Sequence, residues 1–333
     1  MRIAINGMGR IGRLLFRRLL LEPGMELVAV NDIMPAENLL YLLKYDSLFG
    51  PFPAPLHLEN GSICSSARTV KVFQSSDPSQ INWGALDIDV VLECSGRFHS
   101  QAGAQLHLQS GAKRVLLSTT GSPDIPLLIY GFNQHLLTAE TNIVSPGGCM
   151  TNCCTHIIYL LQSIGIESIQ FNILHSYTSR QELVDTAHAQ FRRGRAAAES
   201  IIPVEIDLVS SLERLFPLAG KMSALSIRVP VTNGALTDVT AVLKTETPAS
   251  TINHLFKTAA ESEYKGILGY TEDQLVSADI KGNTHSALID GSLTAVVGRQ
   301  VKLIAWFDNE YGYTSRMIDW LHCWKTLLEK NGV

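Results

Sequence analysis

The N-terminal segment restricts the fold more strongly than any other part of the chain. An apolar run, Arg2–Asn6, is followed by the glycine-rich segment Gly7-Met-Gly-Arg-Ile-Gly12 and by apolar residues at helical spacing over Arg13–Leu21. A second apolar run, Leu27–Asn31, ends at Asp32. This order predicts a strand–helix–strand unit in which the helix begins at the glycine-rich turn, as in dinucleotide-binding folds.

Each glycine of this segment has its own role in such a unit. Gly7 permits the tight turn, Gly9 lets the main chain approach a pyrophosphate, and Gly12 lets the helix pack closely on the strand. Asp32 lies twenty residues beyond Gly12, where a carboxylate can accept hydrogen bonds from the hydroxyls of an adenosine ribose. The pattern therefore predicts a bound dinucleotide. A glycine-rich turn without a ligand is the alternative.

Strands and helices continue to alternate up to residue 148. The expected elements are strands at Asp89–Glu93, Arg114–Ser118, Leu127–Tyr130 and Asn142–Val144 and a helix at Gln101–Gln109. They predict an α/β fold with a doubly wound, mostly parallel sheet of the Rossmann type. Ser95 and Ser118 lie at the carboxyl ends of strands, where such sheets bind ligands, and are candidate cofactor contacts; ordinary loop serines are the alternative.

The pattern changes in the second half of the chain. The expected strands there lack regular helical crossovers: Leu225–Pro230, Thr237–Leu243, Ser292–Val297 and Val301–Trp306. They predict an α+β domain with a mixed or antiparallel sheet. Apolar residues then recur at helical spacing, which predicts an amphipathic helix over residues 314–329.

Cys149 is the candidate nucleophile of this second domain. It follows a Gly-Gly turn and precedes an apolar run, Thr155–Leu161, that reads as a helix. A thiol at a helix N-terminus is expected to have a lowered pKa. His175 ends the strand-like run Ser168–Leu174 and could serve as the base of a Cys/His pair. The alternatives are a buried structural cysteine, or a zinc site built from Cys149, Cys153 and Cys154.

Composition excludes several classes of protein. The chain has 333 residues, 46% of them hydrophobic, and a net charge of −4, so nucleic acid is not an expected partner. No apolar run approaches the ~20 residues of a membrane helix, so no membrane partner is expected. Six irregularly spaced cysteines do not suggest a disulfide framework and favour a cytoplasmic setting.

Six sequence blocks together resemble the glyceraldehyde-3-phosphate dehydrogenases over essentially the whole chain. In chain order they are Ala4-Ile-Asn-Gly-Met-Gly-Arg-Ile-Gly-Arg13, Lys44-Tyr-Asp-Ser47, Cys149-x-Thr-Asn-Cys153, His175-Ser-Tyr-Thr178, Arg228-Val-Pro230 and Trp306-Phe-Asp-Asn-Glu-Tyr-Gly-Tyr313. The resemblance implies an NAD-dependent homotetramer. It also implies a Rossmann domain, residues 1–148 completed by the C-terminal helix 314–333, and a catalytic domain, residues 149–313.

The resemblance also implies a reaction. Cys149 attacks a small phosphorylated aldehyde, His175 assists as base, hydride passes to NAD, and inorganic phosphate releases the resulting thioester as an acyl phosphate. Asn309, Tyr313 and the main chain of Arg10 and Ile11 are implied cofactor contacts. The implied substrate contacts surround Cys149 and the loop beyond His175: Gly148, Met150, Thr151, Thr178, Arg180 and Arg228. No metal site is expected.

The chain departs from the family pattern near the expected site of the attacking phosphate. Gly148 and Met150 each lack a hydroxyl that relatives carry, and Ile206-Asp207 stands where phosphorylating enzymes have Thr-Gly. A carboxylate there would repel phosphate. Either main-chain amides and Thr151 compensate and phosphate still releases the thioester, or the protein is a hydrolytic dehydrogenase of erythrose 4-phosphate or another anionic aldehyde. A catalytically weak paralogue that binds NAD is a separate alternative.

Two further departures concern specificity. Arg180 stands where the family commonly has Asp or Thr; it adds a guanidinium to the pocket for the substrate phosphate, or it points to solvent. Thr186-Ala187 replaces a Leu-Pro pair found in NAD-specific members. This replacement leaves NADP tolerance open, although Asp32 would repel a 2′-phosphate.

Overall fold

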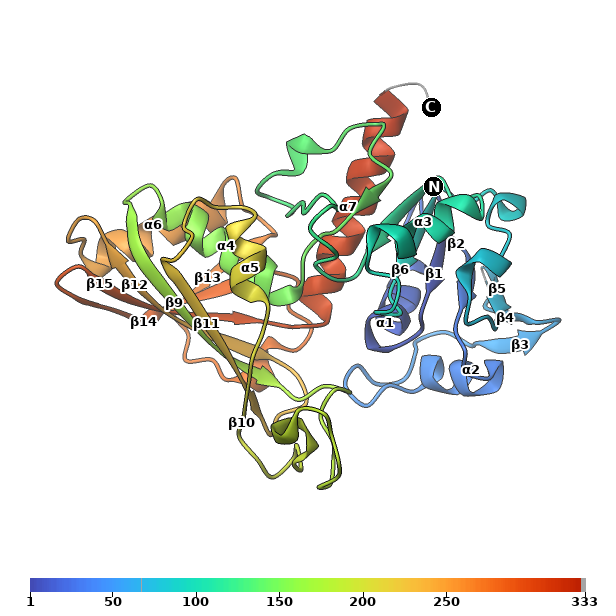
Figure 1. Ribbon diagram of the computed structural model, residues 1–333, viewed down its shortest axis with the longest axis horizontal. Helices are drawn as coiled ribbons and strands as arrows, with labels where there is room; N and C mark the ends of the chain where they lie inside the picture. The colour runs from blue at the N-terminus through green and yellow to red at the C-terminus, as the bar shows by residue number, and fades with distance from the viewer. Residues whose placement is uncertain (67, 331–333) are drawn as a thin grey trace. The chain divides into compact units, whose positions relative to one another are not determined.

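The predicted strand–helix–strand unit is present at the N-terminus of the computed structural model, which describes residues 1–66 and 68–330. It consists of β1 (Arg2–Asn6), α1 (Arg10–Leu19) and β2 (Glu26–Asn31), and β1 pairs with β2 in parallel. The helix begins at Arg10, earlier than the apolar spacing suggested, because Gly9 with its extended backbone is already the N-cap. Figure 1 shows these elements in the dark blue part of the ribbon.

The first sheet contains eight strands in the order β3-β4-β5-β2-β1-β6-β7-β8. The pairs from β5 through β8 are parallel, and β3–β4 and β4–β5 are antiparallel. The remaining elements of this part are α2 (Ala36–Lys44), β3 (His57–Glu59), β4 (Ser62–Cys64), β5 (Thr69–Phe73), η1 (Pro78–Gln80), η2 (Gly84–Leu86), β6 (Val90–Glu93), α3 (Gln101–Gln109), β7 (Arg114–Leu117), η3 (Gln134–Leu136) and β8 (Ile143–Val144).

The strand expected at Leu127–Tyr130 is absent. This segment makes only one isolated bridge, between Leu127 and Ser145. The side chain of Asn133 explains the difference, because its amide donates to the carbonyl of Leu127 at 3.1 Å and accepts from the N–H of Ile129 at 2.6 Å. The polar groups that a strand would use are thus taken by a turn, as is common for Asn.

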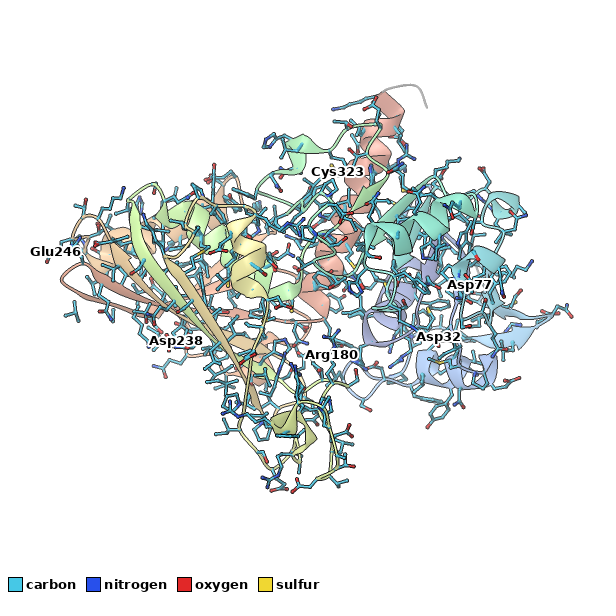
Figure 2. All side chains as sticks on the ribbon, in the orientation of Figure 1. Asp32, Asp77, Arg180, Asp238, Glu246 and Cys323 are labelled. Atoms are coloured by element: carbon cyan, nitrogen blue, oxygen red, sulfur yellow. The ribbon has the colours of Figure 1, made fainter. Side chains whose placement is uncertain are left out.

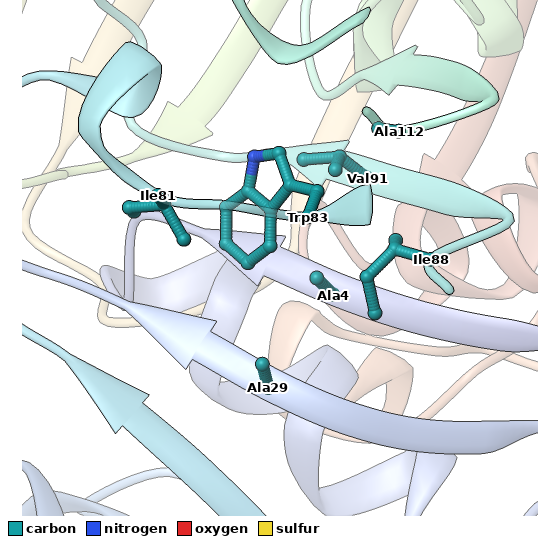
Figure 3. Close-up of a cluster of buried hydrophobic side chains, with 7 residues drawn as sticks. All are labelled: Ala4, Ala29, Ile81, Trp83, Ile88, Val91 and Ala112. Carbon is teal, nitrogen blue, oxygen red and sulfur yellow. The ribbon is translucent and has the colours of Figure 1, made fainter. Parts of the chain in front are cut away.

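A core under this sheet is centred on Trp83, whose ring is fully buried. Small and branched apolar side chains pack around it, as Figure 3 shows: Ala4, Ala29, Ile81, Ile88, Val91 and Ala112. The indole Nε1 donates to Nδ1 of buried His107 at 3.2 Å, and His107 Nε2 lies 3.0 Å from Glu93 Oε2. The polar atoms of this core are therefore paired, as burial requires.

The second sheet contains seven strands in the order β10-β11-β9-β12-β15-β14-β13, with antiparallel pairs and two parallel ones. Its elements are α4 (Cys149–Leu161), β9 (Ile166–Ser176), η4 (Phe191–Gly194), β10 (Ile202–Val204), α5 (Leu208–Glu213), β11 (Met222–Val229), β12 (Ala235–Leu243), α6 (Ala249–Glu261), β13 (Leu268–Thr271), η5 (Ser277–Ile280), β14 (Ala287–Val297) and β15 (Gln300–Phe307). The predicted fold class, a mostly parallel α/β sheet plus an α+β part with a mixed sheet, is confirmed.

The chain divides into two compact units. One comprises residues 1–148 and the C-terminal segment from Arg316, and the other comprises Cys149–Ser315. The last helix, α7 (Tyr311–Lys330), begins in the second unit and continues into the first. Its buried side chain Trp320 packs against Tyr130, with ring centroids 5.8 Å apart. Within the described residues, no helix is both long and apolar enough to cross a membrane.

Candidate active site and cofactor pocket

Cys149 and His175 lie beside each other in the second unit. Cys149 is the first residue of α4, and His175 is the penultimate residue of β9. The Cys149 Sγ atom is 3.9 Å from His175 Nε2. The helix begins at the cysteine itself, and the strand extends far enough to carry the histidine, so that the predicted partners meet.

The hydrogen bonds of His175 determine how its ring can act. Its Nδ1 atom is 2.7 Å from the carbonyl oxygen of Ser176. Because a carbonyl oxygen only accepts, Nδ1 carries the proton, and the lone pair of Nε2 faces the thiol. His175 is therefore placed to take a proton from Cys149.

Both groups are neutral at physiological pH. Burial raises the pKa of Cys149 to about 11, although the nearby charge of Arg228 acts in the opposite direction. Burial and the charge of Arg228 lower the pKa of His175 to about 3. The main-chain N–H groups of Cys149 and Met150 at the start of α4 do lower the thiol pKa, as expected, but burial is the larger effect and the net shift is upward. One pKa unit corresponds to about 1.4 kcal/mol, so burial outweighs the ~0.3–1 kcal/mol that a helix terminus supplies.

The zinc alternative for the cysteines has no support in the structure. Cys153 and Cys154 are completely buried, and Cys153 Sγ lies 3.7 Å from Thr237 Oγ1. Among the described residues, the group whose potential metal ligands lie within 4.8 Å of one another is His57, Glu59 and Cys64. Cys149, Cys153 and Cys154 do not form such a group.

Arg228 lies next to the Cys/His pair. It occupies the register position opposite His175 on β11, which is parallel to β9. The side chain is 8% exposed, and its Nη1 donates to the carbonyl of Ser176 at 3.4 Å. A buried guanidinium beside a reactive thiol can bind an anionic substrate group.

Thr178 lies in the loop directly after β9 and is organised by Gln181. The main-chain N–H and the hydroxyl of Thr178 donate to Gln181 Oε1 at 3.0 and 3.2 Å, and the N–H of Arg180 donates to Thr178 Oγ1 at 3.3 Å. Gln181 is 6% exposed, and its buried Nε2 has no partner among the described residues. The sequence analysis missed Gln181. Only its position, three residues beyond the candidate Thr178, could have indicated it.

The other predicted substrate contacts near Cys149 differ in how exposed they are. Gly148 is half-buried, and a Cβ atom built there would have no neighbour within 4 Å. Met150 is half-buried in the first turn of α4, and Thr151 is 3% exposed. Asp207 is exposed at the N-cap of α5. The charges that act on Arg228 are those of Cys149, Arg193 and Arg180, so the expected repulsive carboxylate is not among them.

Asn309 also lies close to this pair of strands. The hydroxyl of Ser176 donates to Asn309 Oδ1 at 3.1 Å, so the amide N–H groups of Asn309 are the donors that no described residue engages. Tyr313 is 5% exposed in the first turn of α7, so little of its side chain can contact a ligand.

A cavity of about 230 Å³ lies at the carboxyl ends of β1 and β2. Its lining includes predicted cofactor contacts together with residues that the sequence analysis did not single out: Asn6, Gly7, Gly9, Asn31, Asp32, Ile33, Met34, Ser75, Ser76, Cys94, Ser95, Arg97 and Phe98. Asn6 and Asn31 end adjacent parallel strands, a position that could have identified them. Ser118 follows β7 but is outside this lining.

The three glycines of the turn differ in the space around their Cα atoms. A Cβ atom at Gly7 would lie 2.3 Å from the main chain of Ser95, and one at Gly12 would lie 2.0 Å from the carbonyl of Gly7. A Cβ atom at Gly9 would have no neighbour within 4 Å. Gly7 and Gly12 therefore make close packing possible, and the open space at Gly9 lies at the N-terminus of α1, where a pyrophosphate can bind.

Two charged residues of this region have defined orientations. The Arg10 guanidinium pairs with Asp46 at 2.6 Å, so its side chain is engaged while the main chain of Arg10 and Ile11 forms the first turn of α1. Asp32 directly follows β2 (Figure 2) and accepts from the N–H groups of Met8 and Met34 at 2.6 and 3.0 Å. Each oxygen of Asp32 keeps a lone pair for a ribose hydroxyl. The cavity, the open helix terminus and the acid together fit NAD.

Ser95 is held tightly at the edge of the cavity. Its hydroxyl and N–H both donate to Glu93 Oε1, the latter at 2.7 Å. Glu93 Oε2 also accepts from Asn6 Nδ2, at 2.5 Å, and Asn6 Oδ1 accepts from Asn31 Nδ2 at 2.7 Å. A buried hydrogen-bond network therefore fixes the polar groups that line the cavity.

Comparison with known proteins identifies the family. Residues 1–101 match the description "Glyceraldehyde 3-phosphate dehydrogenase, NAD binding domain", and residues 148–309 match "Glyceraldehyde 3-phosphate dehydrogenase, C-terminal domain". The chain is 39% identical over 322 residues to glyceraldehyde-3-phosphate dehydrogenase 2 of Bacillus subtilis, covering 96% of this chain and 95% of that one. It is 40% identical over 329 residues to glyceraldehyde-3-phosphate dehydrogenase of Borreliella burgdorferi, covering 96% and 98%. The chain therefore belongs to the glyceraldehyde-3-phosphate dehydrogenase family.

Proposed function

We propose that the protein oxidises glyceraldehyde 3-phosphate with NAD and releases the product as an acyl phosphate with inorganic phosphate. The observation that carries this proposal is the pairing of Cys149 Sγ with the free lone pair of His175 Nε2. The relatives named glyceraldehyde-3-phosphate dehydrogenase support the substrate, and the match to the NAD binding domain of that family supports the cofactor.

The Cys/His geometry accounts for the covalent steps. His175 Nε2 takes the thiol proton as Cys149 sulfur bonds to the aldehyde carbon, and the imidazolium protonates the resulting oxyanion. His175 then removes the hydroxyl proton as the carbonyl reforms and hydride leaves, which produces a thioester on Cys149. A phosphate oxygen attacks that thioester, the C–S bond breaks, and the thiolate is regenerated.

The two compact units divide this work in our proposal. Residues 1–148 with the C-terminal helix bind NAD through the cavity beside Asp32 and the open turn at Gly9. When bound, NAD accepts the hydride. The residues from Cys149 onward supply the nucleophile, the base and the anion-binding Arg228. Asn309 is suited to hold a carboxamide oxygen with its free N–H groups.

The cofactor preference depends on Asp32. Replacing it with alanine is expected to lower the preference for NAD over NADP about tenfold or more, because a hydrogen bond to a charged group contributes ~1.5–3 kcal/mol. The preference is measured as the ratio of kcat/KM values for the two cofactors. Asp32→Asn is the matched control, which loses the charge but keeps an acceptor and should lie between. An unchanged ratio in both variants would exclude Asp32 as the selecting residue.

We expect weak binding of the inorganic phosphate that attacks the thioester, because Gly148 and Met150 supply no side-chain hydroxyl near Cys149. The open space at Gly148 provides a direct test, since a serine fits there without a clash. Gly148→Ser should lower the KM for inorganic phosphate about tenfold, as expected for one added hydrogen bond to an anion. Gly148→Ala adds the Cβ without the hydroxyl and should leave this KM unchanged. An equal effect of both variants would mean that the hydroxyl is irrelevant.

Product identity tests the proposal as a whole. Wild-type protein is supplied with glyceraldehyde 3-phosphate and NAD at increasing phosphate concentrations, and the product is identified. Phosphate-dependent formation of an acyl phosphate supports phosphorolysis. A free acid formed at a rate independent of phosphate would establish the hydrolytic alternative. NAD binding without turnover on a panel of phosphorylated aldehydes would indicate the catalytically weak paralogue.

We also propose that the protein is a cytoplasmic homotetramer. Four large apolar side chains of the segment beyond Thr178 are strongly exposed in the isolated chain: Leu183, Val184, Phe191 and Ile201. Exposed apolar groups of this kind favour burial against another subunit. The six cysteines are free thiols, which agrees with a reducing compartment. Light scattering after size-exclusion chromatography should give the mass of four chains; the mass of one chain would contradict this assembly.

A further inference from the structure

Three arginines of the second unit act on one another electrostatically. Arg228 lies on β11, Arg193 on η4, and Arg180 in the loop after β9, where Figure 2 labels it. Burial and, to a smaller extent, the charge of Arg180 lower the pKa of Arg193. Burial and the charges of Arg193 and Arg180 lower the pKa of Arg228 to about 10. The positive charges of neighbouring arginines therefore act on both Arg193 and Arg228.

This group of arginines has unused donors. The Nε atom of Arg228 and the Nη1 atom of Arg193 are buried and have no hydrogen-bond partner within the described part of the chain. Leaving such donors unpaired is costly, more so for charged groups. Among the described residues, no carboxylate belongs to the groups whose charge acts on Arg228, which are Cys149, Arg193 and Arg180. An oxyanion bound here would satisfy the donors and offset the positive charge.

Arg180 is the member of this group that departs from the family pattern. Its main chain is fixed by the bond to Thr178, while its side chain is exposed and forms no ion pair that would neutralise it among the described residues. An aspartate at this position would leave the three positions with a net charge of one. Arginine gives a net charge of three, which favours a doubly charged phosphate over a neutral or singly charged group.

We propose that Arg180 is a specificity-determining residue that, with Arg193 and Arg228, holds a phosphate oxyanion beside Cys149. The inference rests on the proposed function and deepens it, because the anion is either the phosphoryl group of the aldehyde substrate or free inorganic phosphate. The exposed position of Arg180 makes it an adjustable part of the site, and Arg228 is the buried, fixed part.

The test compares Arg180→Gln and Arg180→Lys with the wild type. Arg180→Gln should raise the KM for glyceraldehyde 3-phosphate about tenfold, corresponding to about 1.4 kcal/mol, and should leave kcat/KM for unphosphorylated glyceraldehyde within about twofold. Arg180→Lys keeps the charge and should restore part of the affinity. If Arg180→Gln instead raises the KM for inorganic phosphate and leaves the KM for glyceraldehyde 3-phosphate unchanged, the bound anion is the attacking phosphate. Unchanged KM values for both would overturn the proposal.

Arg192→Gln is the matched control. Arg192 is exposed on η4 next to Arg193, and its charge is not among those that act on Arg228. This variant should keep wild-type KM values; a rise equal to that of Arg180→Gln would show a general effect of surface charge and contradict a specific role.

A binding measurement separates this inference from the activity. Inorganic phosphate should raise the melting temperature of the wild type more than an equal ionic strength of sodium chloride does, because a ligand that binds only the folded state stabilises it. Arg180→Gln should lose most of this shift. This measurement does not depend on whether glyceraldehyde 3-phosphate is a substrate. If phosphate still raises the melting temperature of Arg180→Gln as much as that of the wild type, the role of Arg180 is contradicted. If the rise is lost in the variant, the role is supported.

Discussion

Replacing Cys149 with serine is expected to abolish dehydrogenase activity while NAD binding survives. The hydroxyl of serine is a far weaker acid than a thiol whose pKa is about 11, and its oxygen cannot form the thioester that the reaction requires. We expect kcat to fall by at least about four orders of magnitude, as for the loss of other enzymatic nucleophiles. NAD binding should be unchanged within about twofold, because the cavity beside Asp32 is lined by residues of the first unit.

Cys153→Ser is the control for this variant. Cys153 is four residues further along α4, completely buried, with its sulfur near Thr237. It should keep most of the wild-type kcat, although the buried change can lower stability. Near wild-type activity in Cys149→Ser, or an equal loss in both variants at matched folded fraction, would contradict the assignment of the nucleophile.

Replacing His175 with asparagine is expected to lower kcat by about 10²–10⁴-fold, the usual contribution of a general base. The pKa of Cys149 is raised to about 11 by burial, so hardly any thiolate exists at pH 7 without a base. The rate of the variant should therefore rise with pH, roughly tenfold per unit up to about pH 10, as hydroxide ionises the thiol. The wild type should show little dependence over this range, since His175 with a pKa of about 3 stays neutral and available.

The pH dependence distinguishes catalysis from a structural role. A variant that merely disturbs packing would lose activity at every pH by a similar factor, and melting temperatures would follow the loss. His254→Asn is a suitable control because His254 is exposed on α6 and should tolerate the change. A flat pH profile for His175→Asn would contradict the role of its imidazole as the base.

The N-terminal unit could be predicted well because local and global signals agree there. Apolar strands, the spacing of three glycines and the acid at Asp32 each indicate the same fold, and β1 and β2 form as expected. The strand expected at Leu127–Tyr130 failed because a single side chain, Asn133, takes up its main-chain groups. Apolar composition alone does not show which partner a carbonyl will have.

The candidate site also shows that sequence patterns do not reveal the surroundings of a side chain in the folded protein. The sequence could predict that Cys149 and His175 belong together, and the structure places their reactive atoms 3.9 Å apart. It could not predict that burial raises the thiol pKa, since burial depends on the packing of distant segments. Gln181 and Arg193 were not singled out for the same reason: their importance comes from unpaired donors that only the folded chain reveals.

The most direct measurement of the central claim is a single turnover without phosphate, followed by intact-mass and peptide analysis. Wild-type protein mixed with glyceraldehyde 3-phosphate and NAD should form one NADH and one acyl group per chain, and the acyl group should lie on the peptide that contains Cys149. Phosphate added afterwards should remove the acyl group and yield the acyl phosphate. NADH formation without an adduct, or an adduct on any residue other than Cys149, would contradict the account.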